Sequence, residues 1–223
     1  MKKKLILKIP SQLWYEKKLW KEGLELIAGV DESGRGPLAG PVVAAAVIFP
    51  PEINLKGIRD SKKLLPQKRE ELFDKIFNSA LSIGIGVVDQ KEIDRINILN
   101  ATLAAMHLAI LDLNITPEFV LVDGNRKIPE LGIPQLPIIG GDNLSLFVAS
   151  ASIVAKVTRD RLMLRYNKTY PQFCFDRNKG YCTKSHVEAL KTYGPCEIHR
   201  SSFRTVKFLQ RKKGPLKFKD HKT

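Results

Sequence analysis

Two short apolar segments that run directly into carboxylates constrain the fold of this chain more than any other feature. Leu26 to Val30 leads into Asp31 and Glu32, and Phe119 to Val122 leads into Asp123. Short runs of this composition predict strands. These segments are too apolar to lie on an ordinary surface, so the acids that follow them are not ordinary surface residues.

Helical and extended patterns intermix along the first part of the sequence. Helical spacing of apolar residues predicts helices in the segments 11–22, 66–77, 90–113 and 144–165. Apolar runs predict two further strands, at 41–49 and 81–88. The first half of 144–165 is apolar and small and its second half is charged, which indicates a buried helix that emerges into solvent. The intermixing predicts an α/β domain.

The composition changes near residue 170, beyond which Lys, Arg, aromatics and short helical patterns prevail. We therefore expect a main domain at 1–170, a C-terminal helical region at 171–210 and a basic, mobile tail at 211–223. The tail has too little apolar surface to offset the entropy of ordering it.

The formal net charge of +14 predicts attraction to polyanions, with nucleic acid as the leading candidate. Solubility, ribosome association or an anionic membrane surface would also suit this charge. No run approaches the roughly 18 to 20 apolar residues of a membrane span. The apolar run Leu5–Leu7 ends at Lys8, too early for a secretion signal. We expect a soluble, cytoplasmic protein with no membrane partner.

Three cysteines, Cys174, Cys182 and Cys196, are present in the sequence. No two of them are closely spaced, so the paired-cysteine pattern of a zinc site is missing, and three cysteines make no disulfide framework. We expect reduced thiols rather than disulfides or a zinc site.

The strand-end acids, together with Asp142 after Gly140-Gly141, predict a metal site. Carboxylates at the ends of adjacent strands point into one crevice, where their charges repel unless a cation neutralises them. Oxygen ligands favour Mg²⁺ or Mn²⁺, and two such ions about 3.5 to 4 Å apart can hydrolyse a phosphodiester. Taken singly, Asp142 could be a helix N-cap and Asp123-Gly124 a simple turn. Glu32 has no comparable capping role.

The loop Gly34-Arg35-Gly36-Pro37-Leu38-Ala39 fits a lenient dinucleotide-binding fingerprint, so an NAD-type oxidoreductase is an alternative. That fingerprint requires a helix to begin here, whereas Pro37 and Pro41 predict extended chain. The glycines are better explained by a backbone that approaches a ligand closely, beside a guanidinium ready for a phosphate or sugar hydroxyl.

The sequence resembles ribonuclease HII, the type 2 ribonucleases H of bacteria. The matching stretches are AGVDESGRGPLAGPVVAAAV at 28–47, DSKKL at 60–64, DG at 123–124, GDNLSLFVASASIVAKVTRDRLM at 141–163, GYCTKSH at 180–186 and IHRSSF at 198–203. They follow the family's order over nearly all of the chain. The sequence departs from the family's pattern in two places: Cys182 stands where Gly is usual, and Phe147-Val148 stand where small or polar residues are usual. The GRG loop and the short segment before residue 26 favour this family over ribonuclease HIII.

The resemblance implies a ribonuclease H-like catalytic domain at 1–170, with a central mixed sheet flanked by helices, and a substrate-binding role for 171–210. It implies an endonuclease that hydrolyses the RNA strand of RNA–DNA hybrids and cuts 5′ of ribonucleotides embedded in duplex DNA, leaving 3′-hydroxyl and 5′-phosphate ends. The implied cofactors are two Mg²⁺ or Mn²⁺ ions. The implied protein is a monomer, with a sliding clamp as a candidate partner.

The resemblance also implies the site residues. The metal-binding and catalytic set is Asp31, Glu32, Asp123 and Asp142. The substrate-binding set is Gly34, Arg35 and Gly36 at the 2′-hydroxyl of an RNA–DNA junction, Tyr181 stacked on the neighbouring deoxyribose, and Ser61, Lys62 and Lys63 at backbone phosphate.

Four other residues have plainer interpretations. Lys156 and Arg159 would by default form a solvated helix face, and His186 and His199 would be structural or loose phosphate contacts. A basic nucleic-acid-binding module without catalysis remains the second functional hypothesis, and the oxidoreductase the third.

Overall fold

The computed structural model describes residues 13–51, 53, 55, 57–58 and 65–213. The predicted residues Ser61, Lys62 and Lys63 and most of the tail at 211–223 lie outside the described residues. In chain order the elements are α1 (Trp14–Lys21), β1 (Ile27–Ser33), β2 (Val42–Ile48), α2 (Pro66–Ser79), β3 (Ser82–Val88), α3 (Gln90–Leu111), β4 (Phe119–Asp123), β5 (Gln135–Ile138), α4 (Gly141–Leu144), α5 (Leu146–Thr169), the 3₁₀ turn Pro171–Phe173, α6 (Phe175–Asn178), α7 (Lys184–Tyr193) and α8 (Arg204–Lys213).

A five-stranded mixed sheet in the order β3-β2-β1-β4-β5 forms the centre of the molecule. β1 and β2 pair antiparallel, as do β2 and β3, while β1 and β4 and then β4 and β5 pair parallel. The prediction of a mixed sheet flanked by helices is confirmed. Its parallel half matters most here, because the carboxyl ends of β1 and β4 lie side by side.

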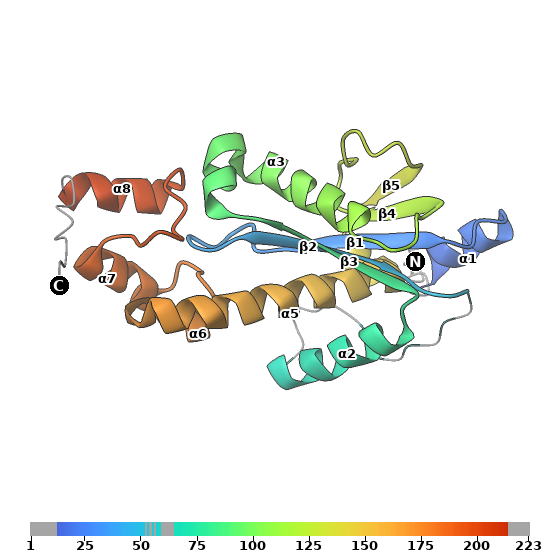
Figure 1. Ribbon diagram of the computed structural model, residues 1–223, viewed down its shortest axis with the longest axis horizontal. Coiled ribbons are helices and arrows are strands. Elements are labelled where there is room, and N and C mark those ends of the chain that lie inside the picture. Colours follow the sequence, from blue (N-terminus) through green and yellow to red (C-terminus); the bar gives the residue numbers. More distant parts are fainter. Residues whose placement is uncertain (1–12, 52, 54, 56, 59–64, 214–223) are drawn as a thin grey trace, which may run out of the picture.

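Helices cover both faces of this sheet, α3 on one face and α5 with α2 on the other (Figure 1). All seven residues of β2 are buried, since its side chains enter the apolar core on both faces. Alternation along β1 sends Ile27 toward α5 and Ala28 toward α3. Each face of the sheet therefore has its own apolar core.

Glycines in the strands let these helices approach the sheet closely. A Cβ at Gly86 would lie 1.9 Å from the carbonyl oxygen of Ala105 on α3. A Cβ at Gly29 would lie 2.2 Å from the carbonyl carbon of Phe147 on α5. Backbone therefore packs against backbone on both sides. Phe147 itself is fully buried and packs edge-on against Phe49, as expected of a residue at a core position.

The start of α5 is held by α1. Ser145 is the N-cap and accepts a hydrogen bond from the backbone of Val148. The buried carboxyl of Glu16 accepts from the Ser145 hydroxyl at 2.6 Å and from the Phe147 N–H at 3.2 Å. Burial raises the pKa of Glu16. The N-cap of α5 is therefore Ser145, and the alternative of Asp142 as N-cap is wrong.

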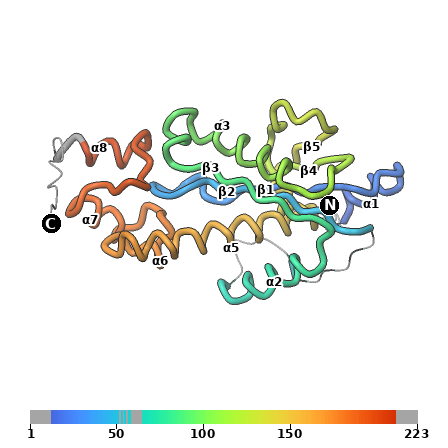
Figure 2. Tube along the Cα trace, viewed as in Figure 1, coloured from blue at the N-terminus to red at the C-terminus, as the bar shows by residue number. Residues whose placement is uncertain are grey.

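Residues 171–213 gather at one end of the molecule, next to the end of α5 (Figure 2). Their apolar side chains, such as Phe173 and Phe175, share a buried cluster with Leu38, Ala39 and Met163 of the preceding part. The division near residue 170 stays a prediction. These contacts do place the C-terminal helices directly against the loop between β1 and β2.

Three local features differ from the sequence prediction. β1 continues through Asp31 and Glu32 to Ser33, because it still pairs with β2 there after its pairing with β4 has ended at Val30. The edge strand β5 was not predicted because it has only four residues and contains Pro137, which argues against a strand in a sequence pattern. α3 is interrupted at Asn97, whose φ is 68° and whose side chain caps the next turn by accepting from the N–H groups of residues 99 and 100.

No helix in the described part of the chain is both long and apolar enough to cross a membrane. Cys174, Cys182 and Cys196 are free thiols, as predicted. Cys182 is exposed, and positive φ angles occur at Lys179 and Gly180 rather than at Cys182. The backbone at Cys182 therefore does not require glycine.

Gly86→Ala should lower the free energy of unfolding by about 1 to 3 kcal/mol, because the new methyl meets the α3 backbone rather than a movable side chain. Urea unfolding followed by circular dichroism measures this change. Gly36→Ala is the control for stability, since its Cβ would meet only Tyr181, at 3.8 Å. Equal stabilities for the two variants would contradict the tight packing of α3.

Candidate active site

The register of the parallel pair β1 and β4 brings two acids together. Val30 pairs with Val122, so Asp31 and Asp123 are the next residues at the carboxyl ends of neighbouring strands. Leu121 faces the α5 side of the sheet, and alternation places Asp123 on that side as well. Asp31 accepts a hydrogen bond from the side chain of Ser152 on α5. The two acids therefore project into one space beside α5.

Glu32 completes a cluster of three carboxylates. One oxygen from each of Asp31, Glu32 and Asp123 lies within 4.8 Å of the others. Asp31 is 3% exposed, and burial, followed by the charges of Glu32 and Asp123, raises its pKa well above the usual value. The cluster therefore carries unfavourable negative charge.

The donors of this cluster fit a hard divalent cation. All three are carboxylates, which suit Mg²⁺ or Mn²⁺ better than softer metals. The repulsion at buried Asp31 is what a cation would relieve. The Arg35 guanidinium, with Nη1 3.3 Å from Glu32 Oε1, is 52% exposed and offsets the charge only at the rim. Asp31, Glu32 and Asp123 could thus hold a metal ion together.

Asp142 lies beside this cluster but outside it. The preceding residue, Gly141, donates its N–H to Asp123 Oδ1 at 2.8 Å. The Asp142 carboxylate is buried and accepts from the Asn143 side chain at 2.9 Å. Asp142 is not among the described residues that line the pocket over the three acids. Its assignment as a metal ligand stays a prediction.

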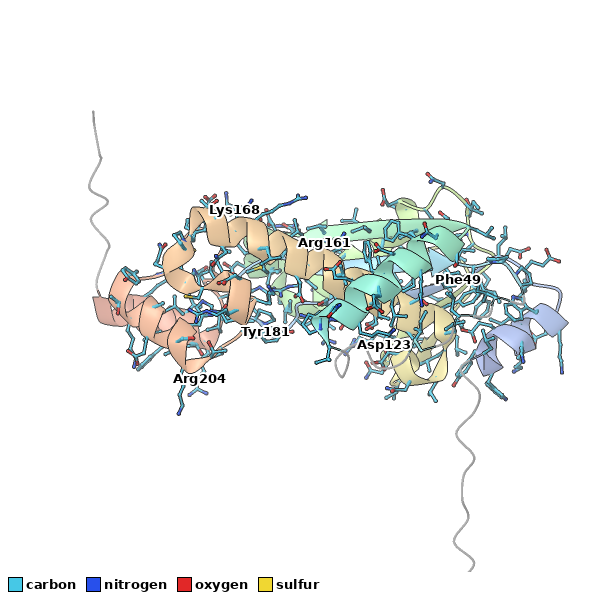
Figure 3. All side chains as sticks on the ribbon, turned by 90° about the horizontal axis from the view of Figure 1, so that it is seen from below. Phe49, Asp123, Arg161, Lys168, Tyr181 and Arg204 are labelled. Atoms are coloured by element: carbon cyan, nitrogen blue, oxygen red, sulfur yellow. The ribbon has the colours of Figure 1, made fainter. Side chains whose placement is uncertain are left out.

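The predicted substrate loop and Tyr181 lie around the same pocket. The residues that line it are Asp31, Glu32, Ser33, Gly34, Arg35, Gly36, Asp123, Ser152, Lys156 and Tyr181. Tyr181 is 42% exposed, and its ring lies 5.8 Å from Lys156 Nζ and 5.9 Å from the Arg159 guanidinium carbon. Figure 3, viewed from the α5 side, shows Tyr181 between the C-terminal helices and Asp123. No helix begins in the GRG loop, so the dinucleotide fingerprint lacks its required context.

The interpretation of Lys156 and Arg159 as a solvated face is wrong. Arg159 is fully buried and donates to the carbonyl groups of Ala39, Pro41 and Lys179. Lys156 is largely buried, pairs with Asp160 at 2.6 Å and lines the acid pocket. Burial lowers the pKa of Lys156. Both cations therefore belong to the site rather than to solvent.

The two histidines form a buried chain of hydrogen bonds. The backbone N–H of Cys196 donates to His199 Nδ1, the Nε2 atoms of His199 and His186 are 3.0 Å apart, and His186 Nδ1 lies 2.9 Å from the Tyr181 carbonyl oxygen. Counting donors assigns the protons, because a carbonyl can only accept: His186 Nδ1–H donates to Tyr181 and His199 Nε2–H donates to His186. Both rings are neutral and structural, and phosphate contact is excluded by their burial.

Sequence reasoning missed two contributors to the site, Ser152 and Arg200. Ser152 precedes Arg159 by seven residues on α5, so a helical wheel could have placed them on one face. Arg200 is fully buried below the GRG loop. It lies about 165 residues from that loop, and no local pattern reports such a contact.

Comparison with known proteins gives a consistent result. The family model described as Ribonuclease HII matches residues 28–206. A ribonuclease HII from Caldanaerobacter subterraneus subsp. tengcongensis is 58% identical over 198 residues, covering 89% of this chain and 82% of that protein. Two solved structures each have a TM-score of 0.70. The ribonuclease H2 of Pyrococcus horikoshii is 29% identical, covering 83% of this chain and 97% of that one. The ribonuclease HII of Archaeoglobus fulgidus, in complex with PCNA, is 28% identical, and the match covers 80% of this chain and 95% of that one.

Asp31→Asn should stabilise the metal-free fold by about 1 kcal/mol at neutral pH, because it removes a buried charge repelled by two others. The same variant should lose the increase in melting temperature that Mn²⁺ gives the unsubstituted protein. Thermal melts with chelator and with Mn²⁺ measure both effects. Asp112→Asn, on an acid outside the cluster, is the control for Mn²⁺. A variant that is destabilised in chelator and still responds to Mn²⁺ would contradict the cluster's role.

Acid should destabilise the fold through His199. Burial and His186 lower the pKa of folded His199 from 6.5 to about 3, so the unfolded chain binds more protons between these values. The free energy of unfolding therefore falls as the pH drops below 6.5, with a contribution of about 2 kcal/mol from this group by pH 5. Denaturant melts between pH 7 and pH 5 measure the slope. His199→Gln should flatten it and His107→Gln should not; equal slopes would refute the assignment.

Proposed function

Because this chain belongs to the ribonuclease HII family, we propose that it cuts duplex DNA on the 5′ side of embedded ribonucleotides by two-metal-ion hydrolysis. Membership makes the chain an endonuclease that hydrolyses the RNA strand of RNA–DNA hybrids with divalent metal. The finer proposal concerns single ribonucleotides, the number of ions and the residues that act. It includes 3′-hydroxyl and 5′-phosphate product ends.

One observation supports this proposal most directly. The three carboxylates open into a pocket that is also lined by Gly34, Arg35, Gly36 and Tyr181. A metal site that hydrolyses phosphodiesters and a loop suited to a sugar hydroxyl thus face the same space. Cleavage at the junction of a ribonucleotide with DNA requires both in one place.

Each residue has a role that follows from its contacts. Asp31 and Asp123 would hold the cations, with Asp31 oriented by Ser152 and Asp123 oriented by the N–H of Gly141. Two bound divalent ions would polarise the scissile phosphate, lower the pKa of an attacking water and stabilise the leaving 3′ oxygen. Lys156 would attract substrate phosphate, and Tyr181 would stack on the deoxyribose. We assign Glu32 and Asp142 to the same metal-binding set.

A basic nucleic-acid-binding module without catalysis is the alternative that composition suggested. Such a module gains nothing from three acids gathered in the pocket that a phosphate backbone must enter, because the acids repel the phosphates.

Phosphate binding by Ser61, Lys62 and Lys63 remains part of the proposal.

Partners beyond the substrate are also part of the proposal. The Archaeoglobus fulgidus relative was solved in complex with PCNA. A monomer that can dock on a sliding clamp is our expectation for this chain. Size-exclusion chromatography with and without the cognate clamp addresses both points.

Incubation with a DNA duplex that holds one ribonucleotide should give a single nick on its 5′ side in Mg²⁺ or Mn²⁺. Denaturing gels with mapped product ends measure the outcome, and the all-DNA duplex of the same sequence is the control. No nick in either metal would overturn the proposal.

Asp123→Asn should reduce this cleavage at least about 10³-fold while changing duplex affinity little, because the carboxylate acts through the metal. Asp112→Asn is again the matched control. Unchanged turnover of Asp123→Asn would remove Asp123 from the metal-binding set.

A further inference from the structure

A fully buried guanidinium group lies beneath the loop between β1 and β2. Arg200 donates five hydrogen bonds to carbonyl oxygens of this one loop, and a guanidinium has five N–H groups to donate. The acceptors are Gly34 at 2.6 Å, Arg35 at 3.0 Å, Pro37 at 2.8 Å, Gly40 at 2.9 Å and Pro41 at 3.1 Å. All five N–H groups of Arg200 therefore donate to the backbone of this loop and hold it in one conformation.

Arg159 on α5 supports the same loop with a second buried guanidinium. Its Nε donates to Pro41, which Arg200 also contacts, and its Nη atoms donate to Ala39 and Lys179. The approach is so close that a Cβ at Gly34 would lie 2.1 Å from Arg159 Nε. Arg159 therefore links the loop to the segment just before Tyr181.

Neither guanidinium pairs with a carboxylate in the part of the chain that the structure describes. Burial lowers the pKa of Arg159 to about 10 and that of Arg200 to about 9, which leaves both charged at neutral pH. Asp160 and Asp94 stabilise the two charges from a distance, but the hydrogen-bond partners of both groups are peptide carbonyls. Two buried charges without a paired carboxylate are costly, and packing alone would be served better by apolar side chains. This cost favours a role in the site.

The orientation of two peptide groups follows from the contacts of Arg200. The C=O and N–H of a trans peptide group point in opposite directions. Because the carbonyl groups of Gly34 and Arg35 point at Arg200, the N–H groups of Arg35 and Gly36 point away from it. Further along the loop, the N–H of Leu38 donates to Gly180 and that of Gly40 donates to residue 198. By contrast, no described residue accepts from the N–H of Arg35 or Gly36.

The backbone at Arg200 is held in place by its own contacts and by those of the next two residues. The backbone N–H and the hydroxyl of Ser201 and of Ser202 donate to Asp94 on α3. The backbone N–H of Arg200 donates to the carbonyl oxygen of Leu38 at 2.9 Å. The guanidinium is therefore a rigid support for the peptide groups above it.

We propose that Arg200, supported by Arg159, is a positioning residue that fixes the N–H groups of Arg35 and Gly36 as paired donors for the 2′-hydroxyl oxygen of the substrate. The inference rests on the proposed function. Successive N–H groups turned to one side form a concave binding site for an oxygen acceptor. Arg200 thus sets the selectivity for ribose without touching the substrate.

A cycle that combines the removal of Arg200 with the removal of the 2′-hydroxyl tests this role. Affinities are measured in the Asp123→Asn background, where substrate stays intact, for a duplex with one ribonucleotide and for the all-DNA duplex. The parent should prefer the ribonucleotide by about tenfold or more, and Arg200→Lys should reduce this ratio to about twofold or less. Affinity for all-DNA duplex should stay within about twofold, since lysine keeps the charge.

A purely structural role would instead lower both affinities together and leave the ratio unchanged. The matched control is Arg161→Lys, an exposed arginine on α5 that pairs with Glu70 and does not contact the loop. Its ratio should equal that of the parent. If Arg200→Lys does not melt cooperatively, Arg200→Gln and Arg159→Lys take its place under the same criterion.

Cleavage separates this inference from the proposed function. In the otherwise unsubstituted protein, Arg200→Lys should lower kcat/KM on the single-ribonucleotide duplex about tenfold and keep the melting shift given by Mn²⁺. A protein without substitutions that fails to nick this duplex would overturn the proposed function. A protein that nicks it, with an Arg200→Lys variant of full ratio and full kcat/KM, would overturn only the role of Arg200.

Discussion

The parallel register of β1 with β4 is the constraint on which the rest of the site depends. It places Asp31 and Asp123 next to each other at the carboxyl ends of two buried strands. Two carboxylates in that position repel, and Glu32 adds a third charge. The fold accepts this cost because the surrounding sheet is held by apolar packing on both faces. A cation bound between the carboxylates would remove this repulsion, so the clustered charges favour cation binding.

The remaining elements position what lies around these acids. Close contact of α5 with Gly29 of β1 brings Ser152 within reach of Asp31. The far half of α5 carries Arg159 beneath the β1–β2 loop, and the C-terminal segment brings Arg200 to the same loop. One long helix thus connects the clustered acids with the residues that shape the β1–β2 loop. Mutual support of this kind is what rigid positioning of a reactive centre requires.

Much of this arrangement could be predicted from sequence, because local chemistry determines it. Apolar runs identified the strands that carry Asp31 and Asp123, and Pro66 marked the first residue of α2. The path of α3 could not be predicted, since Asn97 interrupts a pattern that reads as one helix. The burial of Arg159 was also missed, because its partners are carbonyl groups, two of them more than a hundred residues away. Backbone acceptors carry no sequence signal.

The location of the metal ions tests the central claim most directly. Crystals of the protein grown with Mn²⁺ and an all-DNA duplex would give anomalous peaks at the ions. The account predicts peaks at about 2.0 to 2.3 Å from carboxylate oxygens of Asp31 and Asp123, in the pocket lined by the GRG loop. Occupied Mn²⁺ sites elsewhere on the molecule, with none between these two acids, would contradict it.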